Sequence, residues 1–406
     1  MSLLDYCKND RQREVIELYE QGYRSLDIGK QIGITDSSAR RTVRKVKGYG
    51  LNKGYNPDWG MNEPYPGGHQ FTHATVHRRG GEVIEVWDRM KKVPESVFKT
   101  AQSIADSFTH NTQPLPRIAP PTSRQADKDI IPWYQLGDAH IGMVAYQSQV
   151  NEKFDLDIAK KMIQTAVQEL IDQTPPCERC VINDIGDGVH YDNESGKTPK
   201  NGHDLDMAGC TADVLAVYSE AIRYIIESAA RKHRNVDVII NQGNHNPIHA
   251  LVMALELRWF YKENPRITIL DNRNLFIPYR MGNTFVMCHH GHTVKPGKLP
   301  GVMASDYRQD FGETQYHYID KGHVHHGAAY IDHSQATEES FNIITPNDKH
   351  AHDAGYRSRR FLSCLMRSKT YGEKGRFRKT AEEIIDKIEG LAPGTTADRR
   401  LTVHTV

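Results

Sequence analysis

The sequence predicts an α/β protein in which two mixed sheets pack as a layered sandwich, preceded by a small all-α domain. From about residue 129 onward, apolar strand-like runs alternate with amphipathic helical stretches, which is typical of a parallel sheet with helices on its faces. After Arg266 the helical stretches thin out and short strand-like runs dominate, which indicates a second sheet packed on the first. A separate group of helical segments lies between residues 10 and 47.

The bulk properties describe a soluble globular protein of more than one domain. The chain has 406 residues, with 38% hydrophobic and 25% charged residues, and this length suggests two or three domains. A net charge of +1 excludes a polycation, so any affinity for nucleic acid must come from local patches. No stretch reads as a signal peptide or a membrane span, and six scattered cysteines fit reduced thiols. We therefore expect a cytoplasmic protein without a membrane partner.

Residues 10 to 47 are predicted to form three short helices. Gly29 is small where two helices must approach, and Gly33 lies where the chain must turn sharply. Apolar residues at helical spacing supply a buried side. This pattern resembles the helix-turn-helix of site-specific recombinases and many repressors, which implies a DNA-binding domain over residues 1–50.

The third of these helices is strongly basic. Five of the eight residues from 40 to 47 are Arg or Lys, on the helix that would enter a major groove. A solvated helix face without a ligand is the alternative, because charge runs are usually that. The candidate DNA contacts are Arg40, Arg41, Arg44, Lys45 and Lys47.

Residues 51–128 are predicted to be a linker that carries two small elements. Residues 48 to 70 are rich in Gly, Pro, Asn and Tyr, and two alternating runs around Gly80 and Gly81 indicate a β-hairpin. A short helix over 95–107 and a second, proline-rich stretch follow. We expect the next domain to begin near Asp129.

Within residues 129–350 each predicted strand is followed by polar residues. The expected helices cover 156–172, 205–233 and 247–262, and the expected strands are IIPWYQL, CVINDI, VDVIIN, ITILDN, LFIPY, NTFVMCHH, HYIDKG, AAYIDH and ESFNIIT. In such a sheet the loops at the carboxyl ends of the strands carry the functional groups.

The residues at these strand ends belong to one chemical type. The stretch GDAHIG contains Asp138 and His140, two residues apart, and GHVHH repeats that spacing with His323 and His325. Between them come a GD with Asp187, a GNH and an HHGH, all far apart in the chain. Carboxylate, amide and imidazole groups that recur at strand ends indicate a shared metal centre.

The ordered set DxH, GD, GNH, HGH and GHxH resembles the calcineurin-like metallophosphoesterases over roughly residues 130 to 350. The resemblance implies a four-layer α/β/β/α sandwich and two metal ions. It implies that one ion is held by Asp138, His140 and His325, that a second is held by Asn244, His290 and His323, and that Asp187 bridges both.

The donor set suggests which metals fit. One carboxylate can serve two cations about 3.5 to 4 Å apart, the separation used in two-metal phosphoryl chemistry. Oxygen and imidazole ligands without thiolate suit Mn²⁺, Fe, Mg²⁺ or catalytic Zn²⁺. The family resemblance favours Mn²⁺.

The resemblance also implies a catalytic pair, His245 and Asn246. In the family the histidine of GNH protonates or stabilises the leaving oxygen, and the next residue is usually an aspartate that holds the imidazole. Here it is Asn246, which lacks the charge that would raise the pKa of the ring. We hypothesise a weaker general acid, or one whose orienting carboxylate comes from elsewhere. His190, Asp192 and Asn193 are candidates to line the substrate cleft.

The C-terminal segment, 351–406, is basic with interleaved aromatic residues. It is expected to complete or cap the catalytic domain, and either contacts nucleic acid or forms a surface strand pair with its aromatics in the core.

Three functions follow. The first is a two-metal nuclease acting on DNA, similar to SbcD-type double-strand-break-repair exonucleases, with the module arrangement of phage-encoded proteins and a tendency to pair as a homodimer. The second is a phosphatase or cyclic nucleotide phosphodiesterase, and the third is a DNA-binding regulator with an inactive phosphoesterase domain.

Overall fold

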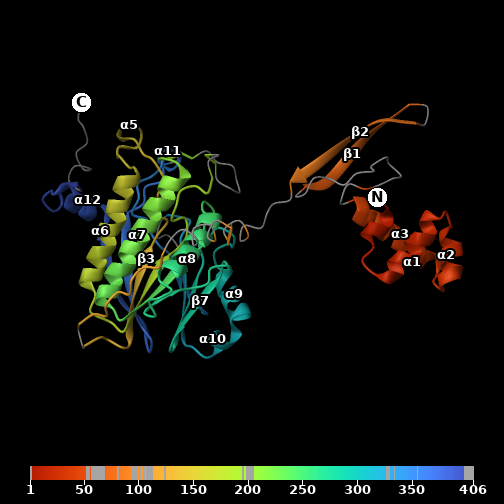
Figure 1. The fold of residues 1–406 in the computed structure, drawn as a ribbon. Coiled ribbons are helices and arrows are strands. Elements are labelled where there is room, and N and C mark those ends of the chain that lie inside the picture. The colour runs from red at the N-terminus through yellow and green to blue at the C-terminus, as the bar shows by residue number, and fades with distance from the viewer. Residues whose placement is uncertain are drawn as a thin grey trace. The chain divides into compact units, whose positions relative to one another are not determined.

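The computed structural model contains two compact units, Met1–Ser96 and Val97–Val406 (Figure 1). It describes residues 2–51, 55, 69–79, 82–92, 99, 102–103, 106, 113–122, 125–193, 196–197, 205–325, 330–332, 334–353 and 355–396. Among these residues no helix has the length and apolar character needed to cross a membrane.

The first unit contains the three expected helices around a small apolar core. They are α1 (Asp10–Glu20), α2 (Ser25–Ile32) and α3 (Asp36–Leu51), preceded by the short η1 (Leu3–Tyr6). A Cβ at Gly29 would lie 2.6 Å from the main-chain oxygen of Ile34, so only glycine lets the turn approach α2. Gly33 ends α2 with a left-handed φ of 69°. Both glycines therefore have the roles that the sequence suggested.

The same unit carries the expected hairpin. Strands β1 (His69–Arg79) and β2 (Glu82–Lys92) pair antiparallel, with Arg79 opposite Glu82 next to the turn. Of the helix expected over 95–107, only residues 99, 102–103 and 106 are described, and these are helical. The remainder of that helix lies outside the described residues.

The second unit is built on a six-stranded mixed sheet in the order β13-β12-β3-β4-β5-β6. Strands β3 to β6 run parallel, whereas β12 and β13 are antiparallel additions at one side. The strands are β3 (Ile130–Leu136), β4 (Arg179–Asp184), β5 (Asn235–Ile240), β6 (Ile267–Ile269), β12 (Phe361–Ser368) and β13 (Gly372–Thr380).

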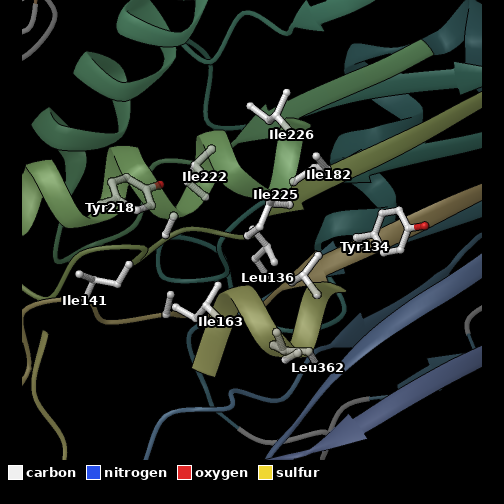
Figure 2. Packing of buried hydrophobic residues seen from close by; sticks show 14 of the residues in the cluster. Tyr134, Leu136, Ile141, Ile163, Ile182, Tyr218, Ile222, Ile225, Ile226 and Leu362 are labelled. Carbon is white, nitrogen blue, oxygen red and sulfur yellow. The ribbon is translucent and has the colours of Figure 1, made fainter. Parts of the chain in front are cut away.

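Helices cover one face of this sheet, and the main core lies between these helices and the sheet (Figure 2). The helices are α5 (Gln147–Val150), α6 (Leu156–Gln173), α7 (Thr211–Lys232), α8 (Pro247–Phe260) and α12 (Ala381–Glu389). Along β3, Tyr134 and Leu136 face this core. Helix α7 begins later than the expected residue 205, because Gly209 has a φ of +81° and Cys210 is the N-cap.

A second mixed sheet, β10-β11-β9-β8-β7, packs on the other face of the first. Its strands are β7 (Ile277–Met281), β8 (Thr284–Cys288), β9 (Tyr316–Lys321), β10 (Tyr330–Asp332) and β11 (Thr337–Ser340). Ile131 and Trp133 of β3 meet Val286 and Cys288 of β8 between the sheets. The run ESFNIIT is a strand only as far as Ser340.

Helix α9 (Leu299–Asp306) and the short α10 (Arg308–Gly312) cover the outer face of the second sheet, while α11 (Lys349–Asp353) lies in the following segment. Phe285 and Met287 of β8 point to this outer core. The layers are therefore helix, sheet, sheet and helix, which confirms the predicted fold class.

Strands β12 and β13 come from the basic C-terminal segment, and much of its charge is paired within the unit. Arg360 contacts Glu152 at 2.7 Å, and Arg376 contacts Glu339 at 2.6 Å. Phe377 packs against the main core. These contacts favour the interpretation of this segment as a strand pair rather than a nucleic-acid surface.

A row of buried polar side chains links the strands just before their functional loops. Asn241 donates to Asn183 at 3.0 Å, Asn183 to Gln135 at 2.8 Å, and Gln135 to Asp320 at 2.6 Å. Arg367 on β12 completes the row with two bonds to Asp320, at 2.7 and 2.8 Å. Because Asp320 lies on β9, this row fixes the two sheets to each other at the level of the strand ends.

A second buried network surrounds His233. Its Nδ1 accepts from the main-chain N–H of Cys177 at 3.2 Å, and its Nε2 lies 2.8 Å from the hydroxyl of Tyr134. Since Nδ1 is an acceptor, the proton of the neutral ring sits on Nε2. Burial, followed by the charge of Lys232, lowers the pKa of His233 from 6.5 to about 3.

We expect acid to destabilise the fold through His233. Between pH 6.5 and about 3 the unfolded chain binds a proton at this ring that the folded chain does not, so its stabilisation is complete above pH 6.5 and is lost as the pH falls. The loss from pH 7 to pH 5 should be about 2 kcal/mol. Urea unfolding at both pH values should show that the free energy of unfolding falls by about 2 kcal/mol less in His233→Asn than in the wild-type protein. An equal drop in both proteins would contradict this role.

Candidate metal centre

All seven expected metal ligands follow strands that end at the same edge of the layered core. Asp138 and His140 follow β3, Asp187 follows β4, and Asn244 follows β5 in the first sheet. The other three, His290, His323 and His325, follow β8 and β9, which run parallel in the second sheet. The topology therefore gathers side chains from five strand ends, as the strand-end pattern predicts.

The first group contains Asp138, His140 and His325, whose ligand atoms lie within 4.8 Å of one another. Nε2 of His140 lies 3.1 Å from Nε2 of His325, and Nε2 of His325 lies 3.2 Å from Oδ2 of Asp138. Asp138 and His140 are buried. This is the set that the family resemblance assigns to one ion.

The second group contains Asp187, His290 and His323, again within 4.8 Å. Nδ1 of His290 donates to the carbonyl of Ile185 at 3.0 Å, which leaves its Nε2 facing the site. That Nε2 lies 2.9 Å from Asp187 and 3.1 Å from the amide oxygen of Asn244. The ligands expected for the second ion thus lie together with the carboxylate expected to bridge.

A third histidine group joins the first. His140, His190 and His245 have ligand atoms within 4.8 Å of one another, and the rings of His190 and His245 stack with centroids 5.4 Å apart. His190 is buried, and its Nε2 makes no hydrogen bond to the residues described. The sequence suggested His190 only as a lining residue, and its position three residues after Asp187 was the available signal.

The backbone of the site adopts left-handed conformations. Among the described residues, five that are not glycine have a positive φ, and four of them are expected ligands: His140 (42°), Asp187 (51°), His323 (70°) and His325 (56°). Each such residue costs on the order of 1–3 kcal/mol, and such costs concentrate at functional sites. The strain points to function rather than stability as the reason for these loops.

Each buried carboxylate rests on a glycine of a neighbouring loop. Asp138 accepts the N–H of His323 at 2.8 Å, and a Cβ at Gly322 would lie 2.2 Å from Oδ1 of Asp138. Asp187 accepts the N–H of His245 at 2.8 Å, and a Cβ at Gly243 would lie 1.9 Å from Oδ1 of Asp187. Glycine is therefore required at both positions for the loops to meet.

In the second group, the charges of Asp187 and His290 stabilise each other. Burial opposes ionisation of Asp187, but His290 and then the imidazoles of His245 and His140 hold its pKa well below the usual range. Burial likewise opposes the charge on His290, but Asp187 and Asp138 raise the pKa of His290 to about 9. By contrast, burial and three neighbouring rings lower the pKa of His140 well below 6.5.

His245 and Asn246, the expected catalytic pair, lie beside these groups, but the amide of Asn246 does not orient the ring of His245. Nδ1 of His245 donates to the main-chain carbonyl of His190 at 2.8 Å, which leaves Nε2 for proton exchange. The amide oxygen of Asn246 instead accepts N–H groups of Gly243 and Asp187, both at 3.2 Å. A neutral carbonyl therefore orients the ring of His245.

Asp192 anchors the helix that follows this pair. Its carboxylate accepts the N–H groups of Ile248 at 2.7 Å and His249 at 2.9 Å, at the start of α8. Burial, despite the opposing effect of His249, raises the pKa of Asp192. Asp192 thus fixes the helix behind the GNH loop.

The residues present fit divalent cations. Oδ1 of the buried Asp138 accepts no hydrogen bond from the described residues, and in the same part of the chain only imidazoles, not lysine or arginine, form ion pairs with Asp138 and Asp187. Such an acceptor left without a partner is costly unless a cation completes it. Oxygen and imidazole donors without thiolate suit Mn²⁺, Fe, Mg²⁺ or Zn²⁺. Ions bound there would supply positive charge and Lewis acidity to a phosphate ester.

The expected DNA contacts lie on α3 of the first unit. Arg41, Arg44 and Lys45 are exposed. Arg40 is exposed as well but pairs with Asp36 at 2.8 Å. Lys47 is half-buried and donates to the hydroxyl of Tyr19 at 2.6 Å, so its charge serves the fold of the unit.

No protein-family model and no curated protein sequence matches this chain. Solved structures similar to it include the following two. A single mutant of Vps29 from Entamoeba histolytica has 10% identity and a TM-score of 0.28, covering 62% of this chain and 99% of that one. YfcE, a phosphoesterase from E. coli, has 11% identity and a TM-score of 0.29, covering 61% and 98%. The chemistry of the site accordingly rests on its own residues.

We expect Gly243→Ala to abolish metal binding while the fold persists. The added Cβ would displace Asp187, whose oxygen and main-chain nitrogen lie 1.9 and 2.4 Å from its position. Titration calorimetry with Mn²⁺ should show at least a tenfold weaker affinity. Gly301→Ala in α9 is the matched control, because a Cβ there meets nothing within 4 Å. Unchanged Mn²⁺ affinity in Gly243→Ala would refute the assignment of Asp187 as a ligand.

Proposed function

We propose that this chain is a two-metal phosphodiesterase of the calcineurin-like metallophosphoesterase family that hydrolyses DNA, resembling SbcD-type repair exonucleases. The observation that carries the proposal is the convergence of Asp138, His140 and His325 beside Asp187, His290 and His323. Two adjacent groups of oxygen and imidazole donors match the needs of two-metal phosphoryl transfer. Mn²⁺ is our proposed metal.

The protein's own residues would divide the work as follows. Asp138, His140 and His325 would hold one cation, and Asn244, His290 and His323 the other, with Asp187 shared. His245 would deliver a proton from Nε2 to the leaving oxygen, since its Nδ1 is engaged with His190. The orienting partner of this ring is a main-chain carbonyl rather than a carboxylate, which supports the hypothesis of a weaker general acid.

The first unit supports DNA as the substrate. A three-helix core with a tight Gly33 turn carries Arg41, Arg44 and Lys45 at helical spacing on one exposed helix. Such a helix-turn-helix would target the phosphodiesterase to duplex DNA in the cytoplasm, and two copies could pair on a symmetric site. A phage-encoded origin is compatible with this combination of modules.

Two alternatives use the same residues. A phosphatase or cyclic nucleotide phosphodiesterase would need only the metal centre, and a DNA-binding regulator would need only the first unit. The strained backbone of four expected ligands argues against an inactive domain, because strain of that kind has no structural benefit there.

Turnover assays on the full chain test the proposal. With Mn²⁺ we expect cleavage of DNA and of bis(4-nitrophenyl) phosphate, and His325→Ala should lower both by about 100-fold or more through loss of a ligand. His317→Ala is the control, since His317 lies on β9, the strand that precedes His325, and bonds to Thr314. Chelation should abolish activity and Mn²⁺ should restore it. Preference for a phosphomonoester would favour the phosphatase, and absence of any turnover the regulator.

A separate experiment tests the first unit. Replacing Arg41, Arg44 and Lys45 by Ala should weaken binding to duplex DNA at least tenfold and reduce the salt dependence of binding by about three counterions. Fluorescence anisotropy over a range of salt concentrations measures both. Arg13→Ala on α1 is the control, as an exposed cation outside α3. An unchanged salt slope in the triple variant would exclude α3 as the DNA contact.

A further inference from the structure

A pocket of about 740 Å³ lies outside the groups described so far. It is lined by residues of the segment 271–278 and by Tyr307. This segment follows β6, the next strand after β5 in the first sheet, and leads into β7 of the second. The pocket is wide and open to solvent rather than enclosed.

The segment 271–278 contacts two stretches that carry expected ligands of the second metal group, at Gln242 and at His289. The side chain of Gln242, two residues before Asn244, donates to the main-chain oxygen of Asn272 at 2.6 Å. The ring of Phe276 in the pocket wall stacks on His289, with centroids 4.8 Å apart and planes 14° from parallel. His289 directly precedes the expected ligand His290.

A row of rings continues from this wall to the ligands. His289 and His292 are nearly parallel, at 5° and 6.1 Å, and His292 lies 5.3 Å from the ring of His290. His289 is held in place because its Nδ1 accepts the N–H of Gly291 at 2.9 Å. A group in the pocket would therefore lie beside a rigid aromatic wall that ends at the metal ligands.

The pocket is chemically suited to a flat, uncharged group. The charged side chains of its wall, Asp271 and Arg273, pair with each other at 2.8 to 2.9 Å, and Arg258 lies 3.9 Å from the same carboxylate. Phe276 and Tyr307 supply aromatic surface, and the hydroxyl of Tyr307 is engaged with the carbonyl of Phe276 at 2.7 Å. Both arginines are thus engaged with Asp271, whereas a nucleobase would find apolar and aromatic walls in Leu275, Phe276, Pro278 and Tyr307.

We propose that this pocket binds a nucleobase next to the scissile phosphate of a DNA strand whose bases are unpaired at that point. This inference rests on the proposed function and names the part of the substrate that the site selects. An unpaired base is required, because a base within an intact duplex is stacked and cannot enter a separate pocket. The metal groups would take the charged phosphate and the pocket the neutral base.

Single-stranded oligonucleotides that carry one abasic site test the inference in the wild-type full chain with Mn²⁺. Loss of the base that occupies the pocket should lower kcat/KM roughly tenfold or more at one position relative to the cleaved bond. If intact and abasic strands are cut equally at every position, the base pocket is refuted while the nuclease function stands. If duplex DNA is cut but no single strand is, the base pocket is again refuted while the nuclease function stands; if neither is cut, the proposed function itself fails.

A variant whose pocket is filled by a larger side chain tests whether the effect of the missing base arises at this pocket. In Leu275→Trp the added rings should occupy the pocket, so intact and abasic strands should be cut at similar rates, whereas Leu275→Met should retain the wild-type difference. A persisting difference in Leu275→Trp would overturn the assignment. Should this variant fail to fold, 2-aminopurine at the sensitive position, bound to wild type with Ca²⁺ in place of Mn²⁺, should be quenched by stacking. Unchanged fluorescence would also overturn it.

Discussion

Two buried carboxylates determine the architecture of the site. Asp138 and Asp187 lie almost fully inside the protein, where an unpaired charge is costly, and no lysine or arginine in the described residues pairs with either. Imidazoles and main-chain N–H groups surround them instead. Despite burial, Asp187 and Asp138 raise the pKa of His290 to about 9, which favours a charged ring that offsets part of their charge. Divalent cations would replace the proton of that ring with a larger and permanent charge.

This constraint explains why the strand ends are tied together beneath the site. The polar row takes one side chain from each of four strands or their ends, namely Gln135 on β3, Asn183 on β4, Asn241 just after β5 and Asp320 on β9. Each of these strands leads into a loop that carries expected ligands. A slip of one strand by one residue would point its side chain to the opposite face and leave the row unpaired. Arg367 extends the row to β12, so even the C-terminal segment contributes to the alignment of the ligands.

The sequence revealed the ligands because each follows a strand, and strand ends of one sheet meet at one edge. It also predicted the layers, since the switch from helical to strand-like runs after Arg266 marks the second sheet. It did not reveal the ion pair of Arg367 with Asp320, because the partners are distant in the chain and a basic strand reads like a basic surface. Nor did it reveal how Asn246 is used, since an amide can accept from the main chain as readily as from a ring.

The metal groups and the pocket around Phe276 and Tyr307 differ in how much they depend on bound cations. Without cations the second metal group already pairs Asp187 with His290, and it offers an anionic phosphate little net attraction. Added cations would reverse this, since His290 would lose its proton to act as a ligand and the site would gain positive charge. None of the residues that line the pocket around Phe276 and Tyr307 is an expected metal ligand. Phosphate recognition would therefore depend on metal, whereas recognition of the base would not.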